Sequence, residues 1–283
     1  MGGGTYLCRV RKSLKRASDH TSAVTVGDVV GVELHGDDGA VESVEPRRTV
    51  LLRRAAGRTP MAQPLAANAD CLIAMTSART PPLNLRACDR LFCLAEDGGL
   101  GCALLINKSD LAEPGEFDSA LADYRNVGYS AHLCSAVTGD GLAEVAELLR
   151  GRTSVLCGPS GVGKSTLLNT LEPGLDLRTA EISGARDRGR HTTTSARMFA
   201  LPSVDARVID TPGLREIGLW RVAPIELGSL FPEMRAHLSG CSMPRCTHSH
   251  EPGCAVKAAA EAGAISPHRY DSYLRILAKL DSA

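Results

Sequence analysis

The sequence predicts a mixed α/β protein in three parts: a small N-terminal β-barrel, a central domain on a parallel sheet, and a helical C-terminal segment. Three observations lead to this prediction. Short β-branched runs separated by Gly-Asp turns fill residues 5–56, and apolar runs alternate with amphipathic segments from about residue 66. A cluster of Cys and His residues then precedes an Ala-rich end. A chain of 283 residues is long enough for two or three domains.

The composition excludes several classes of protein. Lys plus Arg and Asp plus Glu both number 32, so the chain is not a polycation that coats nucleic acid along its whole length. The longest apolar runs, such as 102–106, are far shorter than the roughly 18 residues of a membrane-spanning helix. The N-terminus also lacks an apolar signal segment. We therefore expect a soluble, cytoplasmic protein with no membrane partner.

The N-terminal strands are expected to close into a barrel, because closure removes exposed strand edges. At most four strands are convincing, and they are expected at 23–26, 29–34, 40–44 and 50–52. The Gly- and Pro-containing residues 57–65 are interpreted as a linker.

The central region has the pattern of strands buried on both faces alternating with helices. Strands are expected at 71–75, 102–106, 132–134, 154–157 and 208–209. Helices are expected at 84–96, 117–126, 140–150 and 164–171.

The segment 158–165 (GPSGVGKS) fits the phosphate-binding pattern G-x-x-x-x-G-K-[S/T] and lies between a candidate strand and a candidate helix. Backbone N–H groups of such a loop surround phosphate oxygens. In this pattern the Lys164 ammonium reaches the β- and γ-phosphates, and the Ser165 hydroxyl binds Mg²⁺. Asp210 is the last residue of a candidate strand and begins the segment Asp-Thr-Pro-Gly. It is expected to be the second residue that binds Mg²⁺. The Gly213 amide can sense the γ-phosphate.

Asn-Lys-Ser-Asp at 107–110 follows a buried apolar run and resembles the guanine-reading element of GTP-binding proteins. The Asp110 carboxylate can accept hydrogen bonds from guanine N1–H and the exocyclic amine, a donor pair that adenine lacks. Such a polar mismatch discriminates by roughly 10⁴-fold. Ser135-Ala136 resembles the loop whose backbone N–H meets guanine O6. We therefore expect GTP as the nucleotide.

The order of these motifs is circularly permuted. Ordinary GTPases begin with the phosphate loop and end with the guanine motifs, whereas here Asn107 and Ser135 precede the loop at 158. A permuted sheet can still place every group around one nucleotide, because domain termini often lie close together. The segment after Asp210 then runs directly into the C-terminal region, so hydrolysis could reposition that region.

With these motifs the chain resembles the RsgA (YjeQ) family of GTPases that depend on the small ribosomal subunit. The resemblance covers nearly the whole chain and includes the segments at 26–28, 66–70, 158–166, 189–194 and 210–220. It implies an N-terminal OB-fold, a circularly permuted P-loop GTPase domain and a C-terminal helical zinc-binding domain. The expected boundaries are an OB-fold-like RNA-binding domain at 1–56, a linker at 57–65, the GTPase domain at 66–220 and the zinc-binding domain at 221–283.

The resemblance also implies an activity: hydrolysis of GTP to GDP and phosphate, stimulated by the small ribosomal subunit late in its maturation. The expected partners are that subunit, its rRNA and GTP or GDP, and we expect a monomer. Lys164 and His191 are the expected catalytic residues. The GTP-binding residues are expected to be Asn107, Lys108, Ser109, Asp110, Ser135, Ala136, Gly158, Pro159, Ser160, Gly161, Val162, Gly163, Lys164, Ser165, Thr166, Asp210 and Gly213.

Leu214 occupies the position where many GTPases carry a Gln that orients the attacking water. An apolar side chain cannot do this, so turnover by the chain alone should be slow. His191 is the candidate replacement, because an imidazole can orient or deprotonate water; the alternative is that His191 contacts RNA. One threonine of 192–194 is expected on Mg²⁺ beside Ser165 and Asp210, and the resemblance favours Thr193.

Four candidate metal ligands, Cys241, Cys246, His248 and Cys254, lie within 14 residues. Three thiols and an imidazole suit tetrahedral Zn²⁺ and leave no open position, which predicts one structural zinc ion. His250 is a rival ligand, but the family pattern falls on His248. Of the other cysteines, Cys71, Cys102, Cys134 and Cys157 lie in apolar runs and are expected to be reduced core thiols.

Basic clusters at 9–16, 47–48, 53–54 and 186–190 could follow an RNA backbone. Solvated surface charge is the alternative, and the family resemblance favours RNA. Three other functions are weighed: an rRNA-binding assembly scaffold with incidental hydrolysis, an ATP-using P-loop enzyme, and a permuted GTPase of the large subunit.

Overall fold

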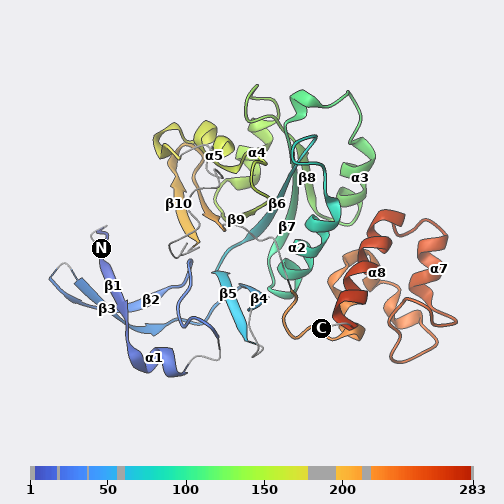
Figure 1. The fold of residues 1–283 in the computed structure, drawn as a ribbon, viewed down its shortest axis with the longest axis horizontal. Coiled ribbons are helices and arrows are strands. Elements are labelled where there is room, and N and C mark those ends of the chain that lie inside the picture. The colour runs from blue at the N-terminus through green and yellow to red at the C-terminus, as the bar shows by residue number, and fades with distance from the viewer. Residues whose placement is uncertain are drawn as a thin grey trace, which may run out of the picture.

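The computed structural model describes residues 4–17, 20–36, 38–55, 61–177, 196–211 and 218–281. The N-terminal strands lie on one side of a central α/β domain and the C-terminal helices on the other (Figure 1). The predicted α/β fold class is confirmed by this arrangement. Among the described residues, none of the helices combines the length and the apolarity needed to span a bilayer.

The central sheet has the strand order β10-β11-β9-β6-β7-β8, and every neighbouring pair is parallel except β10 with β11. Its strands are β6 (Cys71–Ser77), β7 (Gly101–Asn107), β8 (Ser130–Leu133), β9 (Thr153–Cys157), β10 (Arg197–Leu201) and β11 (Ala206–Asp210). The strands β6, β7, β8, β9 and β11 each contain or overlap a run that the sequence predicts as strand. Because the carboxyl ends of parallel strands share one edge, the segments after β7, β8, β9 and β11 gather there.

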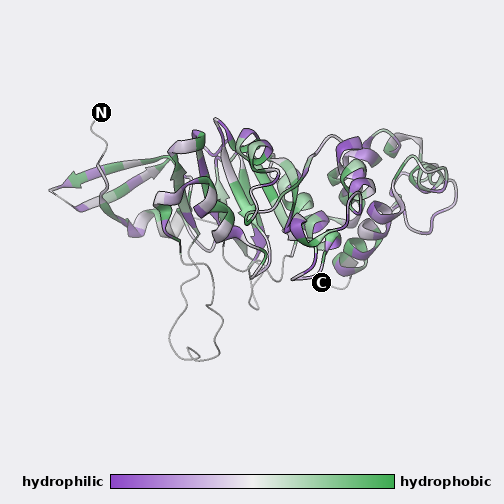
Figure 2. Ribbon diagram, turned by 90° about the horizontal axis from the view of Figure 1, so that it is seen from above, coloured by the Kyte–Doolittle hydropathy of each residue, from purple (hydrophilic) through white to green (hydrophobic). Residues whose placement is uncertain are grey.

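Helices cover both faces of the sheet. They are α2 (Leu85–Asp97), α3 (Asp118–Asn126), α4 (Leu142–Leu149) and α5 (Lys164–Leu171), each within two residues of its predicted range. Alternate residues of β6 pack against the helices on opposite faces of the sheet, because successive side chains of a strand point to opposite faces. Leu72 belongs to the apolar cluster that contains Phe92 of α2, whereas Ile73 belongs to the cluster that contains Leu148 of α4 and Leu168 of α5. The hydrophobic colouring of the central strands in Figure 2 follows from burial on both faces.

The described residues of the N-terminal region form five strands, one more than the sequence suggests. They are β1 (Leu7–Val10), β2 (Val30–His35), β3 (Asp38–Val44), β4 (Val50–Arg54) and β5 (Ala62–Ala67), with the short helix α1 (Lys12–Ala17) between β1 and β2. They form one sheet of order β1-β3-β2 and a second sheet of β4 with β5. β1 escapes detection because its residues are at most half buried, and Leu7 is 72% exposed.

Two N-terminal expectations differ from the structure. Residues 23–26 form no strand, because the chain turns at Gly27, where a side chain would collide with the Ala67 carbonyl. Residues 62–65 of the expected linker belong to β5, which pairs with β4. Pro64 has no backbone N–H to donate to the neighbouring strand, so its presence makes β5 hard to recognise as a strand from the sequence.

The C-terminal region consists of α6 (Pro232–Arg235), α7 (Ala255–Glu261) and α8 (Pro267–Asp281), with a loop between α6 and α7. α8 begins at Pro267, directly after Ser266. The hydroxyl of Tyr270 donates to the His248 carbonyl over 2.8 Å, and that of Tyr273 donates to the Thr247 carbonyl over 2.6 Å. The tyrosine face of α8 therefore packs on the Cys/His loop.

A buried ionic cluster joins α8 to the central domain. Arg269 is 1% exposed, and its guanidinium lies 2.5 Å from the Asp89 carboxylate of α2 and 2.7 Å from the Glu233 carboxylate of α6. The Phe231 ring centroid lies 4.7 Å from the same guanidinium. Although burial opposes ionisation, hydrogen bonds from His268 and the charge of Arg269 lower the pKa of Asp89. The cluster fixes the C-terminal helices against α2.

Replacing Arg269 by Met should destabilise the folded chain by about 3–5 kcal/mol, because two buried carboxylates lose their counter-charge. The exposed Arg275, which pairs with Asp271 one turn away on α8, provides the matched control. Arg275→Met should cost less than about 1 kcal/mol. Urea unfolding of both variants measures the difference, and equal losses of stability would contradict the assignment.

Candidate functional site

The phosphate loop connects β9 to α5. Gly163 is the N-cap of α5 and has φ +102°, so Lys164, Ser165 and Thr166 form the first turn of this helix. A side chain at Gly158 would collide with the Met75 carbonyl of β6, and a side chain at Gly163 would collide with the Asn107 amide. Glycine is therefore required at both ends of the loop. Because the loop leads into the N-terminus of α5, the first N–H groups of this helix are available to bind phosphate oxygens.

The Lys164 side chain folds into the loop. Its ammonium donates to the carbonyls of Gly158 and Pro159 over 2.8 and 3.1 Å. Burial lowers the pKa of Lys164, while the nearby carboxylate of Asp210 opposes this shift. A positive charge is thus held at the place where the sequence pattern expects the β- and γ-phosphates.

Asp210 is the last residue of β11 and lies opposite Leu156 of β9 in the parallel register. Its Oδ1 atom is buried and accepts no hydrogen bond from the described residues. Burial raises the pKa of Asp210, and the charge of Lys164 counteracts this. An unpartnered, buried carboxylate oxygen beside a phosphate loop fits a Mg²⁺ ligand, directly or through water.

Asn107 connects the guanine motifs to the phosphate loop. Its side chain is 2% exposed, and its Nδ2 donates to the Val162 carbonyl over 2.8 Å. Its Oδ1 accepts the Ala136 N–H over 3.1 Å. A guanine oxygen that used the Ala136 N–H would therefore have to share it with Asn107.

Lys108 and Asp110 are held from two sides. Lys108 has φ +65°, and its ammonium donates to the carbonyls of Gly161, over 2.8 Å, and Thr80. The Ser135 hydroxyl donates to Asp110 Oδ1 over 2.5 Å and orients the exposed carboxylate. Ser109 donates its N–H to the Cys134 carbonyl over 3.0 Å. The two guanine motifs therefore form one unit beside the phosphate loop.

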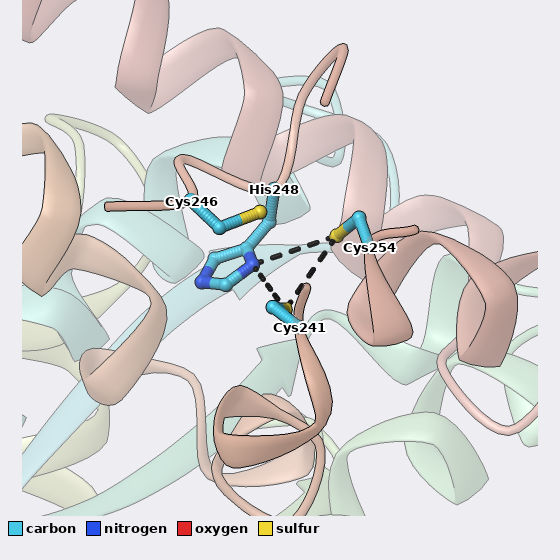
Figure 3. Close-up of side chains that lie close together, drawn as sticks. All are labelled: Cys241, Cys246, His248 and Cys254. Carbon is cyan, nitrogen blue, oxygen red and sulfur yellow. Dashed lines mark hydrogen bonds between the residues drawn. The ribbon is translucent and has the colours of Figure 1, made fainter. Parts of the chain in front are cut away.

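The predicted metal ligands converge at the C-terminal loop. Their ligand atoms all lie within 4.8 Å of one another. Cys241 Sγ and Cys254 Sγ are 3.9 Å apart, and His248 Nδ1 lies 3.4 and 3.6 Å from them; Cys246 completes the group (Figure 3). A tetrahedron with Zn–S bonds of about 2.3 Å has edges of about 3.8 Å. Cys241, His248 and Cys254 thus have the spacing of ligands in a tetrahedral zinc site, and Cys246 lies close enough to be the fourth ligand.

Glu251 organises the loop that carries His248. It is 6% exposed and accepts hydrogen bonds from the N–H and hydroxyl of Thr247, both over 2.6 Å, and from the Ser249 N–H over 2.9 Å. Although burial opposes ionisation, the bonds from Thr247 lower the pKa of Glu251 far below its usual value. Burial also lowers the pKa of His248, which keeps the ring in the neutral form that binds metal.

A family model described as RsgA GTPase matches residues 44–220. The chain belongs to the RsgA GTPase family. The resemblance found in the motifs is therefore confirmed, and it extends over nearly the whole chain.

Similar proteins cover almost the same length. A protein of Gemmatimonas aurantiaca named "Small ribosomal subunit biogenesis GTPase RsgA" is 40% identical over 277 residues, which is 97% of this chain and 90% of the relative. A protein of the same name from Chlorobaculum parvum is 42% identical over 288 residues, covering 99% and 92%. The crystal structure of YjeQ from Thermotoga maritima is 29% identical with a TM-score of 0.75, covering 98% and 90%. That of YloQ, described as a circularly permuted GTPase, is 28% identical with a TM-score of 0.70, covering 97% and 86%.

The structure describes most of the predicted site residues but not all of them. His191, Thr193 and Gly213 lie outside the described residues. Lys164, Asp110 and the four metal ligands lie where their motifs place them in the fold. The supporting contacts from Thr80 and Glu251 carry no motif of their own, although Glu251 is the only carboxylate between the first and last metal ligand.

Some predicted RNA-binding residues have other partners. Arg47 forms a bidentate ion pair with Asp28, whose side chain is 1% exposed, at 2.7 and 2.9 Å. Arg48 lies 2.7 Å from Asp70 at the entry to β6. These arginines stabilise the N-terminal region in the structure, which reduces the charge that they can offer to RNA.

Changing Glu251 to Gln should weaken zinc binding by about 10- to 100-fold, because an amide cannot accept all of the backbone donors that position His248. Zinc affinity can be measured by competition with a chromogenic chelator. Glu261→Gln, an exposed change on α7, is the control and should leave the affinity unchanged. Equal zinc affinities of the Glu251→Gln variant and the unaltered chain would show that Glu251 does not position the ligand.

Proposed function

We propose that the chain hydrolyses GTP to GDP and phosphate, that the small ribosomal subunit stimulates this reaction, and that it acts late in maturation of that subunit. One observation carries the proposal: the Asn107 amide joins the phosphate loop, at Val162, to the guanine motifs, at Ala136. This is the arrangement needed to hold both ends of one guanine nucleotide. The printed names of the relatives support the biological process.

Catalysis in this proposal consists of positioning and charge stabilisation. The ammonium of Lys164 moves from the loop carbonyls to the phosphates and offsets the charge that develops on the γ-phosphoryl group. The first-turn N–H groups of α5 donate to phosphate oxygens. Ser165 and Asp210 hold Mg²⁺, which when bound neutralises charge on the β- and γ-phosphates.

The chain lacks a polar side chain at the position from which many GTPases orient the attacking water. Leu214 follows the Asp-x-x-Gly segment, and its apolar side chain cannot form a hydrogen bond with water. We therefore expect the isolated chain to hydrolyse GTP slowly. His191 is the proposed water-orienting residue, and Thr193 is the proposed further hydroxyl on Mg²⁺.

In this proposal the N-terminal region binds RNA and the C-terminal region binds zinc. Residues 1–56 form an RNA-binding region of OB type, and residues 221–283 form a helical domain with one structural zinc ion. Among the basic residues, Arg9 and Lys12 are the proposed RNA contacts, since Arg11 pairs with Glu33 at 2.7 Å. The protein acts as a monomer in the cytoplasm.

Titration of GTP turnover with isolated ribosomal subunits tests the proposed function. Phosphate release should rise at least tenfold with small subunits and remain at the basal rate with large subunits at the same salt concentration. Salt must be fixed, because phosphate contacts depend steeply on ionic strength. Turnover that is the same with and without small subunits would refute the proposed stimulation, and a response only to large subunits would assign the chain to another particle.

Replacing Asp110 by Asn should weaken GDP binding by a factor on the order of 10⁴, because the new NH₂ donor faces the donors of guanine. Xanthosine diphosphate should bind the variant better than GDP, since its C2 carbonyl accepts that donor. Asp118→Asn, in the exposed first turn of α3, is the control. Calorimetric titration gives the affinities, and unchanged GDP binding would place the guanine elsewhere.

A further inference from the structure

A hollow of about 430 Å³ lies where three parts of the chain meet. Its wall includes Arg54 of β4, Arg90 of α2 and the segment 218–222, and α8 contributes Ile276 and Lys279. None of the residues that bind phosphate or guanine in the proposed function belongs to this wall. The volume is within the range of about 300–1,000 Å³ that is usual for small-molecule sites. We call this hollow the junction pocket.

The charged residues that line the junction pocket are all cationic among the described residues. Arg54, Arg90, Arg221 and Lys279 line it, and no carboxylate of the described residues does. Neither Arg90 nor Arg221 forms an ion pair with a carboxylate in the part of the chain that the structure describes. The guanidinium groups of Arg90 and Arg221 on one concave surface repel each other and attract an anion.

The pocket also offers an aromatic ring. Trp220 is the single tryptophan of the chain, is half buried, and lies in the pocket wall. The guanidinium of Arg221 lies 5.1 Å from the centroid of this indole. Leu219 and Ile276 add apolar surface, and both are at most 7% exposed. A ligand with a planar apolar part and a phosphate group would use both the indole and the arginines.

We propose that the junction pocket binds a nucleotide separately from the phosphate loop, with its base against Trp220 and its phosphate on Arg90 and Arg221. A free nucleoside phosphate and a nucleotide of single-stranded RNA share this chemistry. The Arg54 N–H donates to the Gly218 carbonyl over 2.9 Å, so β4 is already joined to the segment that leaves the central domain. A bound nucleotide would contact both of these segments and α8 together.

Trp220 itself reports on the pocket, because no other residue of the chain contributes tryptophan fluorescence. Full-length protein that carries one molar equivalent of GDP, with excess GDP removed by gel filtration, is titrated with uridine 5′-monophosphate, with uridine, and with a 5′-phosphorylated oligouridine. GDP fills the guanine site, which has no affinity for uracil in the proposed function. Saturable change of the fluorescence with a phosphorylated ligand, and none with uridine, is the expected result.

The double variant Arg90→Gln/Arg221→Gln should weaken the fluorescence response at least tenfold in apparent affinity. Arg90→Gln alone, which leaves the Arg221–Trp220 contact in place, should weaken it at least threefold. The control Arg150→Gln/Arg275→Gln removes the same charge from exposed positions. Unchanged GDP affinity and zinc content show that each variant is folded.

The two ligand sources give different results. A response to the monophosphate supports the pocket as a free-nucleotide site, and a response to the oligouridine alone supports it as a contact for RNA. Absence of any response up to millimolar concentration overturns the proposal. An equal response of the Arg90→Gln/Arg221→Gln protein overturns it as well, because the change in fluorescence would then arise outside the pocket.

Discussion

Two hydrogen bonds of one buried amide, that of Asn107, connect the loops at the carboxyl edge of the central sheet. One bond reaches the phosphate loop at Val162 and the other reaches the Ser-Ala loop at Ala136. The side chain needs both its donor and its acceptor, so neither Asp nor Leu could replace it without leaving a buried backbone group unpaired. The same residue requires glycine at 163, because a side chain there would collide with its amide. The spacing between the phosphate end and the base end of the site therefore depends on Asn107.

This connection explains how a permuted chain can build an ordinary nucleotide site. β7 and β9 are separated by β6 in the sheet, but both end at the same edge, where Asn107 spans the distance. Strand order along the chain is irrelevant to this edge, since only the direction of each strand matters. The permutation changes which segments of the chain lead out of the nucleotide site. β11 ends at Asp210, and the chain continues through the junction pocket to α6 and α8, which Arg269 fixes against α2.

The sequence predicts the central domain well, because β6, β7 and β9 are largely apolar and buried and the loops carry motifs with chemical meaning. It predicts the metal cluster for the same reason, since Cys241 to Cys254 are close along the chain. β1 is missed because its residues are half exposed and pair with β3, about 30 residues away. The cluster of Asp89 and Arg269 could not be predicted, because these residues are 180 positions apart and each resembles an ordinary surface charge. The junction pocket could not be predicted from the sequence for a related reason. Its wall comes from β4, α2, residues 218–222 and α8, which meet only in the folded chain.

A crystal structure with Mg²⁺ and a non-hydrolysable GTP analogue tests the central claim most directly. The account predicts one nucleotide at the carboxyl edge, with the Asp110 carboxylate within hydrogen-bonding distance of guanine N1 and Lys164 on the β- and γ-phosphates. Asn107 should keep both of its bonds in that complex. A nucleotide whose phosphates lie on Lys164 while its base lies away from Asp110 would contradict the account.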